Sequence, residues 1–157
     1  MRHIPNPPRK NPGYNCYGCA PHNPRGLHLQ FFEEGEEIIG IWKPHPDFQS
    51  FENIVHGGIQ MALMDETACW VMMVKVGTAG FTRSMQFNFL KHVYVNQSEI
   101  QIRGRLLEVK DGIANIELKI LDEEGEVRTT SLAEYFVVPV RIALRRLQYP
   151  GKEALGQ

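Results

Sequence analysis

The chain has 157 residues, 43% of them hydrophobic, with 17 basic and 18 acidic side chains and a formal net charge of -1. This length suits one domain that buries its own core. The balanced charge argues against nucleic acid as a partner, and the longest apolar run contains Asp65, Glu66 and Lys75, which excludes a membrane span. The N-terminus lacks the apolar segment of a secretion signal and the three cysteines form an odd set, so we expect a cytoplasmic protein.

The first half of the chain predicts an arm, two strands and a helix. Residues 1–26 are rich in Pro, Asn and Gly, which is typical of an extended arm or loop. Alternating apolar residues predict one strand from residue 27 and another after the turn at 34–35. Residues 57–76 are apolar on nearly all helical faces, begin at a glycine pair and stop at Gly77, so we expect one long buried helix.

The second half predicts strands. Residues 79–90 form a strand whose alternation places Phe81, Arg83 and Met85 on one face. In residues 98–109 the alternation shifts at Leu107, which predicts a bulge. Residues 110–112 predict a hairpin turn into the strand 113–121, and residues 127–138 form the last strand.

These elements favour an α+β fold in which a curved antiparallel sheet of five to six strands wraps around one long central helix. The domain spans residues 27–138, between the arm of residues 1–26 and a tail of residues 139–157 that holds a short amphipathic helix. The outer face of such a sheet and the ends of its helix still need cover, which indicates an oligomer.

Two neighbouring carboxylates interrupt the predicted helix. An ionised carboxylate among apolar residues is costly unless it is paired or hydrogen-bonded. Asp65 and Glu66 point about 100° apart, so they occupy different environments. These carboxylates have a structural interpretation, in which one face of the helix is solvated or Asp65 pairs with an arginine. In the other interpretation, one of them is a catalytic carboxylate.

The segment His56-Gly57-Gly58 opens the same helix. Glycine lets a ligand approach the backbone, and the first N–H groups of a helix lack internal partners and attract negative charge. The pair of glycines either relieves crowding at a buried helix start or provides an oxyanion site.

The stretch VHGGIQMALMDETA resembles the hotdog-fold acyl-CoA thioesterases of the PaaI-like (phenylacetate-pathway) group, in the order His-Gly-Gly, a short apolar run, then an acid and a small residue. The resemblance covers residues 27–138, and the leader CYGCAPHNPRGLHLQF is also similar. It implies hydrolysis of an acyl-CoA to a free acid and coenzyme A, without a cofactor or a catalytic metal.

The resemblance also implies roles for individual residues. Asp65 acts as nucleophile or general base, the Gly57 N–H polarises the thioester carbonyl, His56 shapes the turn, and the Thr82 hydroxyl holds the attacking water. Where the family often has Asn or Gln six residues before the histidine, this chain has Ser50, with Gln49 adjacent. The other predicted substrate contacts are Gly58, Cys69 and Arg83.

The spacing of Gly57 and Asp65 has a structural consequence. Eight helical residues span roughly 12 Å at about 1.5 Å per residue, so one carbonyl cannot touch both from a single helix. If both act on one thioester they come from two chains, which predicts a two-fold homodimer. The resemblance implies that such dimers often pair into tetramers.

Cys16-x2-Cys19, with His22 and His28 nearby, is the remaining motif of interest. A closed zinc site needs four ligands and there is no second Cys pair, so a tight turn is the favoured interpretation and we predict no metal site.

Two other functions fit the same segment. One is a dehydratase or hydratase of 3-hydroxyacyl or enoyl thioesters, with His45 or His56 as base. The other is a non-catalytic acyl-CoA-binding module. Hydration of crotonyl-CoA, or tight binding without turnover, distinguishes them from a thioesterase.

Overall fold

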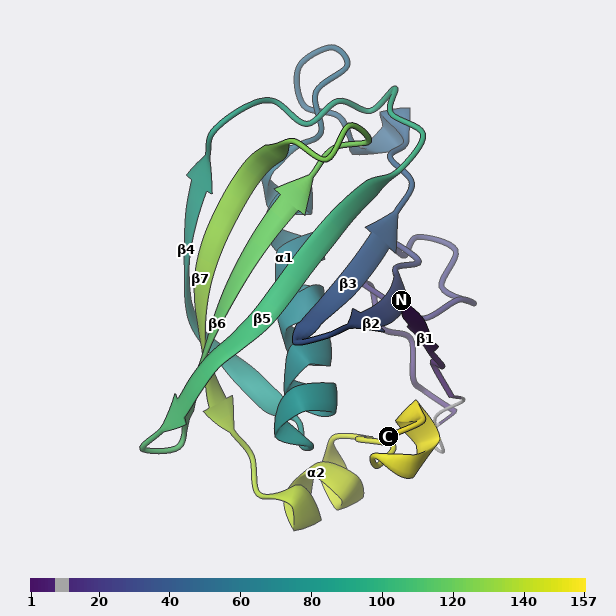
Figure 1. Ribbon diagram of the computed structural model, residues 1–157. Coiled ribbons are helices and arrows are strands. Elements are labelled where there is room, and N and C mark those ends of the chain that lie inside the picture. Colours follow the sequence, from purple (N-terminus) through teal and green to yellow (C-terminus); the bar gives the residue numbers. More distant parts are fainter. Residues whose placement is uncertain (8–11) are drawn as a thin grey trace.

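The computed structural model describes residues 1–7 and 12–157. Within these residues seven strands form one antiparallel sheet in the order β1-β2-β3-β5-β6-β7-β4, and the sheet curves around the long helix α1 (Figure 1). The strands are β1 Arg2–Ile4, β2 Gln30–Glu34, β3 Glu37–Trp42, β4 Gly80–Phe89, β5 Ile100–Lys110, β6 Ile113–Leu121 and β7 Val127–Val137. The helices are η1 Pro46–Phe48, α1 Gly57–Val71, its π-helical continuation η2 Met72–Val76, α2 Val140–Arg146 and η3 Glu153–Leu155.

The predicted α+β fold with one central helix is confirmed, but the strand count of five to six was too low. The additional strand is β1, which lies in the segment predicted as an arm and pairs with β2, placing Ile4 opposite Phe31. Three residues are too few to show a detectable alternation, so the Pro- and Asn-rich composition hid this strand.

Helix α1 is buried because most of its faces are apolar. Leu63, Met64, Ala68 and Trp70 are fully buried, and the Trp70 ring stacks on Phe31 with centroids 4.3 Å apart. The helix lies so close to the sheet that a Cβ added at Gly104 would sit 2.9 Å from a Val71 methyl group. Burial of each large side chain contributes roughly 1.5–3 kcal/mol, which fixes α1 against the sheet.

The turns of the sheet follow the sequence closely. The β5–β6 hairpin turns at Asp111 and Gly112, both with positive φ, and the predicted bulge lies between Leu106 and Glu108. A second bulge, between Thr82 and Ser84 of β4, was not predicted. It reverses the expected alternation in the first part of β4.

Strand β4 ends the sheet, with β7 as its one neighbour in the sheet order (Figure 1). Its far edge has no pairing strand among the described residues, and the strand itself is exposed over most of its length. In the part of the chain that the structure describes, no helix is long and apolar enough to span a membrane.

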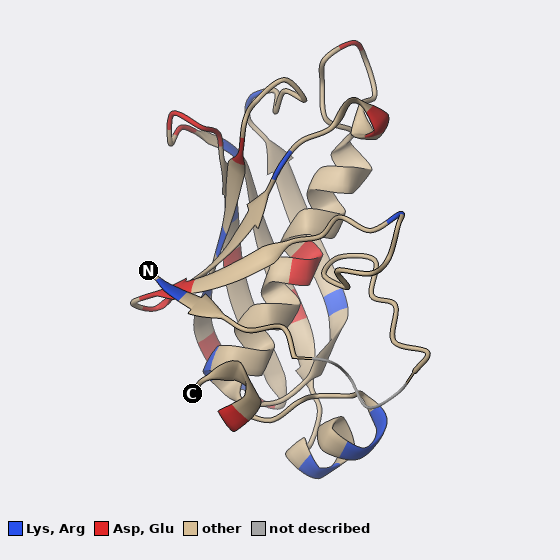
Figure 2. Cartoon of the chain, turned by 90° about the vertical axis from the view of Figure 1, so that its right-hand side faces the viewer, with Lys and Arg blue, Asp and Glu red and all other residues tan. Residues whose placement is uncertain are grey.

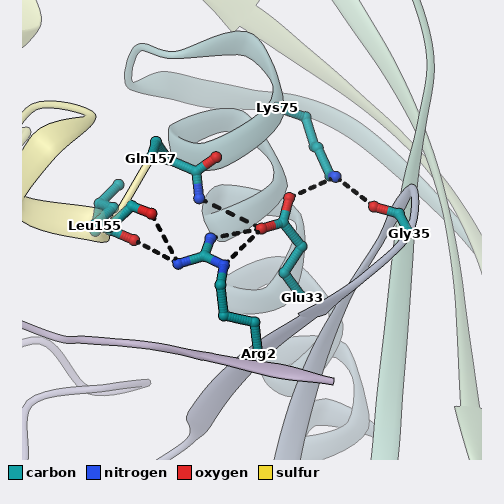
Figure 3. A network of polar contacts seen from close by, with 7 residues as sticks. Arg2, Glu33, Gly35, Lys75, Leu155 and Gln157 are labelled. Carbon is teal, nitrogen blue, oxygen red and sulfur yellow. Dashed lines mark hydrogen bonds and ion pairs between the residues drawn. The ribbon is translucent and has the colours of Figure 1, made fainter.

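The two chain ends meet at Glu33 on β2 (Figure 3). The Arg2 guanidinium donates to Glu33 Oε2, Lys75 Nζ donates to Oε1 at 2.7 Å, and Arg2 also donates to the Gly156 carbonyl at 3.0 Å. Burial raises the pKa of Glu33, but the hydrogen bonds from Lys75, Arg2 and Gln157 outweigh it and lower the pKa to about 2. This network joins β1, β2, the end of the long helix and the C-terminus.

Candidate active site

Asp65 lies in the third turn of α1 and faces the two strands at the β4 edge. The Thr82 hydroxyl donates to Asp65 Oδ1 at 2.7 Å, and the Tyr135 hydroxyl donates to the same oxygen at 2.5 Å. Thr82 and Tyr135 are directly paired across β4 and β7. Among the described residues, Asp65 Oδ2 has no hydrogen-bond donor, so one carboxylate oxygen is anchored and the other is available to a reactant.

Tyr135 was not predicted as a site residue. It is 1% exposed, and burial followed by the neighbouring Asp65 carboxylate keeps the pKa of its hydroxyl above the ordinary value, so it remains a donor. The alternation in residues 127–137 could have indicated this residue, because a tyrosine that faces inward from a strand needs a polar partner for its hydroxyl. Nothing in the sequence indicates that the partner is Asp65, 70 residues away.

The bulge in β4 decides which side chains face Asp65. It places Thr82 and Met85 on the helix side, and it moves Arg83 to the opposite face of the sheet. There Arg83 lies 3.6 Å from a Glu134 carboxylate oxygen and over the Phe136 ring. The structure therefore separates Arg83, which was expected to contact substrate, from Asp65.

His56 caps the start of α1, and its Nδ1 accepts a hydrogen bond from the Gly58 N–H at 2.9 Å. A side-chain cap of this kind satisfies one of the first N–H groups of a helix. The Gly57 N–H has no acceptor among the described residues. Of the two glycines, Gly57 is therefore the one that keeps a free donor at the positive end of the helix dipole.

A groove of about 590 Å³ lies beside Gly57. Ser50 lines it together with Gly57, whereas Gln49 folds back and accepts a hydrogen bond from the Asn53 N–H at 3.1 Å. The predicted Ser50 position thus belongs to the groove and the Gln49 side chain is occupied in its own loop. Apolar side chains form part of the lining: Phe51, Ile54, Val55, Phe89 and Leu90.

Gly57, Met61, Asp65 and Cys69 recur every four residues and form one stripe of α1, here called the open side. Met61 is 38% exposed, and Gly57, Asp65 and Cys69 are partly exposed, although α1 is otherwise mostly buried. The acidic positions within the long helix are visible in Figure 2. Gly57 and Asp65 are two turns apart, roughly 12 Å along the axis, so they do not meet within one chain.

Glu66 occupies another side of the helix, here called the closed side, under the loop of residues 16–19. Trp70 Nε1 donates to Glu66 Oε1 at 3.1 Å, and the Cys16 thiol donates to Oε2 at 3.3 Å. Burial, followed by the negative charge that Cys16 carries when it is ionised, raises the pKa of Glu66 to about 7. Cys69 lies one turn beyond Asp65 on the open side and forms no disulfide with the other described cysteines.

His45 lies outside this arrangement. It caps η1 through Nδ1, which accepts from the Asp47 N–H at 3.2 Å, and it does not line the groove beside Gly57.

Comparisons with known proteins agree with this fold. The family model described as thioesterase superfamily matches residues 52–129, which include Gly57, Asp65 and Thr82. A search of curated proteins finds no match to this chain.

Several solved structures superpose well on the chain. One crystal structure of a thioesterase superfamily protein has a TM-score of 0.70 and 17% identity; the match covers 77% of this chain and 62% of that protein, so this chain spans about three fifths of its length. The protein smu.793 from Streptococcus mutans, bound to acetyl-CoA, has a TM-score of 0.66 at 16% identity, with coverage of 71% and 90%. A hypothetical thioesterase from Streptococcus pneumoniae, with coenzyme A, has a TM-score of 0.66 at 18% identity and the same coverage.

Proposed function

We propose that the chain is a member of the thioesterase superfamily, whose family model matches residues 52–129, and that it hydrolyses an acyl-CoA thioester on its hotdog fold. The observation that carries the proposal is the Asp65 carboxylate, which Thr82 and Tyr135 anchor on one oxygen and which has no donor to its other oxygen among the described residues. The coenzyme A ligands of two similar structures support a coenzyme A thioester as the substrate class.

In the general-base route, Asp65 Oδ2 removes a proton from water as the water oxygen attacks the thioester carbonyl carbon. The carbonyl oxygen becomes an oxyanion that accepts a hydrogen bond from a Gly57 N–H. The C–S bond then breaks, and the coenzyme A thiolate leaves and takes up a proton. In the nucleophilic route, Asp65 Oδ2 attacks the carbonyl carbon and forms an anhydride as the C–S bond breaks and the coenzyme A thiolate leaves and takes up a proton. Water then cleaves the anhydride, which releases the free acid and regenerates the Asp65 carboxylate.

The distance between Gly57 and Asp65 requires two chains for either route. The open side of α1 and the edge of β4, which pairs with no strand of residues 1–7 and 12–157 beyond β7, offer the surface on which a second copy would extend the sheet. In such a two-fold dimer, Asp65 faces the Gly57 N–H of the partner subunit, and two equivalent sites result. The groove beside Gly57, with Phe51, Ile54 and Phe89, fits the apolar part of the acyl group.

The test of the reaction is Asp65→Asn, assayed on a panel of short, long and aromatic acyl-CoAs. The amide keeps the shape but cannot accept a proton, so we expect kcat to fall about 10²–10⁴-fold. Asp111→Asn is the matched control, since Asp111 is exposed at the β5–β6 turn, where asparagine is equally suited. Full activity of Asp65→Asn would exclude the proposed role of Asp65.

The test of the shared site is a purified heterodimer of one Asp65→Asn chain and one Gly57→Pro chain, co-expressed with different tags. Each parent dimer lacks one component in both sites, whereas the heterodimer keeps one complete site. We expect about half the activity of the unmodified dimer from the heterodimer. A heterodimer as inactive as its parents, or a monomer by sedimentation velocity, contradicts the dimer mechanism.

A further inference from the structure

The loop of residues 16–19 places two cysteines against the Glu66 carboxylate. The Cys16 sulfur lies 3.3 Å from Glu66 Oε2, and one donor atom from each of Cys16, Cys19 and Glu66 lies within 4.8 Å of the others. The histidines that the sequence offers as ligands are turned elsewhere: His22 Nε2 contacts the Tyr14 carbonyl and His28 Nε2 contacts the Asn23 carbonyl. The third donor of this cluster therefore comes from the helix.

The approach of the loop to the helix depends on glycine. A Cβ added at Gly18 would lie 2.4 Å from Glu66 Cγ and Oε2, so any side chain there would displace the carboxylate or the loop. The loop is also fixed from its other side: the Leu29 N–H donates to the Gly18 carbonyl at 3.0 Å, and Asn6 Nδ2 donates to the Cys19 carbonyl at 2.8 Å. The position of the two thiols is thus built into the fold.

The Glu66 carboxylate is oriented by Trp70. The indole N–H donates to Oε1 at 3.1 Å, which leaves Oε2 turned toward the cysteines. A hydrogen bond of this kind, from a buried group to the outer oxygen of a ligand, is how proteins hold metal ligands in place.

We propose that Cys16, Cys19 and Glu66 bind one Zn²⁺ ion, which joins the N-terminal arm to the closed side of α1. Two thiolates and a carboxylate are donors that zinc accepts in tetrahedral sites, at about 2.3 Å to sulfur and about 2.1 Å to oxygen. Those bond lengths separate a sulfur from an oxygen ligand by roughly 3.6 Å, and the observed Cys16–Glu66 separation is 3.3 Å. Three negative donors also favour a divalent cation over an apolar packing contact. The sequence argued against zinc because it offers no second cysteine pair to complete four protein ligands, and the proposed site therefore takes a water molecule as its fourth ligand.

The zinc site is separate from the hydrolytic chemistry. It lies on the side of α1 that carries Glu66, whereas the Asp65 carboxylate points to Thr82 and Tyr135. We infer a structural role: the ion ties residues 16–19 to the helix that positions Asp65. Metal binding and thioester hydrolysis are measured independently, so one can fail while the other stands.

The first test uses the full-length protein and Co²⁺ as a spectroscopic probe. Reduced, metal-free protein titrated with Co²⁺ is expected to bind one equivalent and to show a thiolate-to-cobalt charge-transfer band in the near ultraviolet, which Zn²⁺ then abolishes. Protein purified with zinc and dialysed is expected to retain about one zinc per chain. A Co²⁺ spectrum without the thiolate band, or a Cys16–Cys19 disulfide in protein that retains no zinc, overturns the proposal.

The second test uses matched variants. Cys16→Ser, Cys19→Ser and Glu66→Gln each remove one ligand, and we expect each to weaken Zn²⁺ affinity at least 10-fold. Cys69→Ser and Asp65→Asn remove a thiol and a carboxylate outside the cluster and are expected to keep the affinity of the parent. Circular dichroism identifies any variant that fails to fold, and the Co²⁺ spectrum of the unmodified chain stands without them. Unchanged affinity in Glu66→Gln overturns the three-ligand site.

Discussion

Asp65 and Glu66 are consecutive residues of α1, but they lie in different surroundings. Asp65 belongs to the open side, where Thr82 is exposed and one carboxylate oxygen has no donor among the described residues. Glu66 belongs to the closed side, where both oxygens have partners and a loop covers the carboxylate. A rotation of about 100° per residue is enough to separate them. We therefore propose that two neighbouring carboxylates on one helix differ in role, with Asp65 serving the reaction and Glu66 the structure.

The comparison predicts that changes on the open side act on rate, and Gly57→Pro is the sharpest of these. Proline lacks the N–H but suits the first helical position, and His56 before it has φ -57° and ψ 135°, which a following proline tolerates. We expect kcat for acyl-CoA hydrolysis to fall about 10²–10³-fold, the effect of losing one oxyanion donor.

Gly57→Ala is the matched control, because it keeps the N–H. A Cβ at this position meets Phe89 at 3.6 Å, an ordinary contact, so we expect a folded protein. Equal rates for the Pro and Ala variants would show that the N–H takes no part in the reaction.

Changes on the closed side are expected to act on stability, and Trp70→Phe tests this. The substitution leaves a void in a fully buried position and removes the indole hydrogen bond to Glu66. We expect the free energy of unfolding in urea to fall by about 1–3 kcal/mol. Trp42→Phe has the same change in volume at a buried site whose indole makes no hydrogen bond within the described chain. A larger loss of unfolding free energy in Trp70→Phe than in Trp42→Phe would show that the hydrogen bond to Glu66 stabilises the fold. An equal loss in the two variants contradicts this role.

Tyr135 links effects on stability to effects on rate, because this buried core residue positions Asp65, the proposed catalytic residue. Tyr135→Phe keeps the ring and removes the donor to Asp65 Oδ1. We expect kcat/KM to fall about 10-fold, the worth of one hydrogen bond to a charged group. Tyr149→Phe removes a buried hydroxyl that donates to the Met73 carbonyl, far along the chain from Asp65, and serves as the control. If both variants keep full kcat/KM, the anchoring of Asp65 is not needed for the reaction.

The sequence predicted the parts of this site that depend on local pattern. The helix from Gly57 to its end at Gly77, the turn at Asp111-Gly112 and the bulge near Leu107 each follow from residue types a few positions apart. The proximity of Asp65 and Tyr135 does not, because it depends on how the sheet closes over the helix. The expected alternation placed Arg83 on the wrong face of β4. One bulged residue is enough to move the side chains before it to the opposite face of the sheet.

The smallest predicted effect concerns the Glu33 network, which is remote from both sides of α1. The pKa of Glu33 is lowered from 4.5 to about 2, because hydrogen bonds from Lys75 and Arg2 outweigh the effect of burial. A carboxylate with a lowered pKa stabilises the folded state above its unfolded pKa, and that contribution is lost as the pH falls from about 4.5 toward 2.

Glu33→Gln removes the charge at every pH, so we expect about 1 kcal/mol lower stability at pH 7 and a difference from the parent that disappears near pH 2. The measurement is urea unfolding across this pH range, with Glu36→Gln as control, since Glu36 is exposed at the β2–β3 turn and makes no ion pair among the described residues. A stability difference that stays constant down to pH 2 would mean that the Glu33 carboxylate acts through packing and not through its charge. Since Arg2 and Gln157 both reach Glu33, the same experiment reports how firmly the chain ends hold β1 to the sheet.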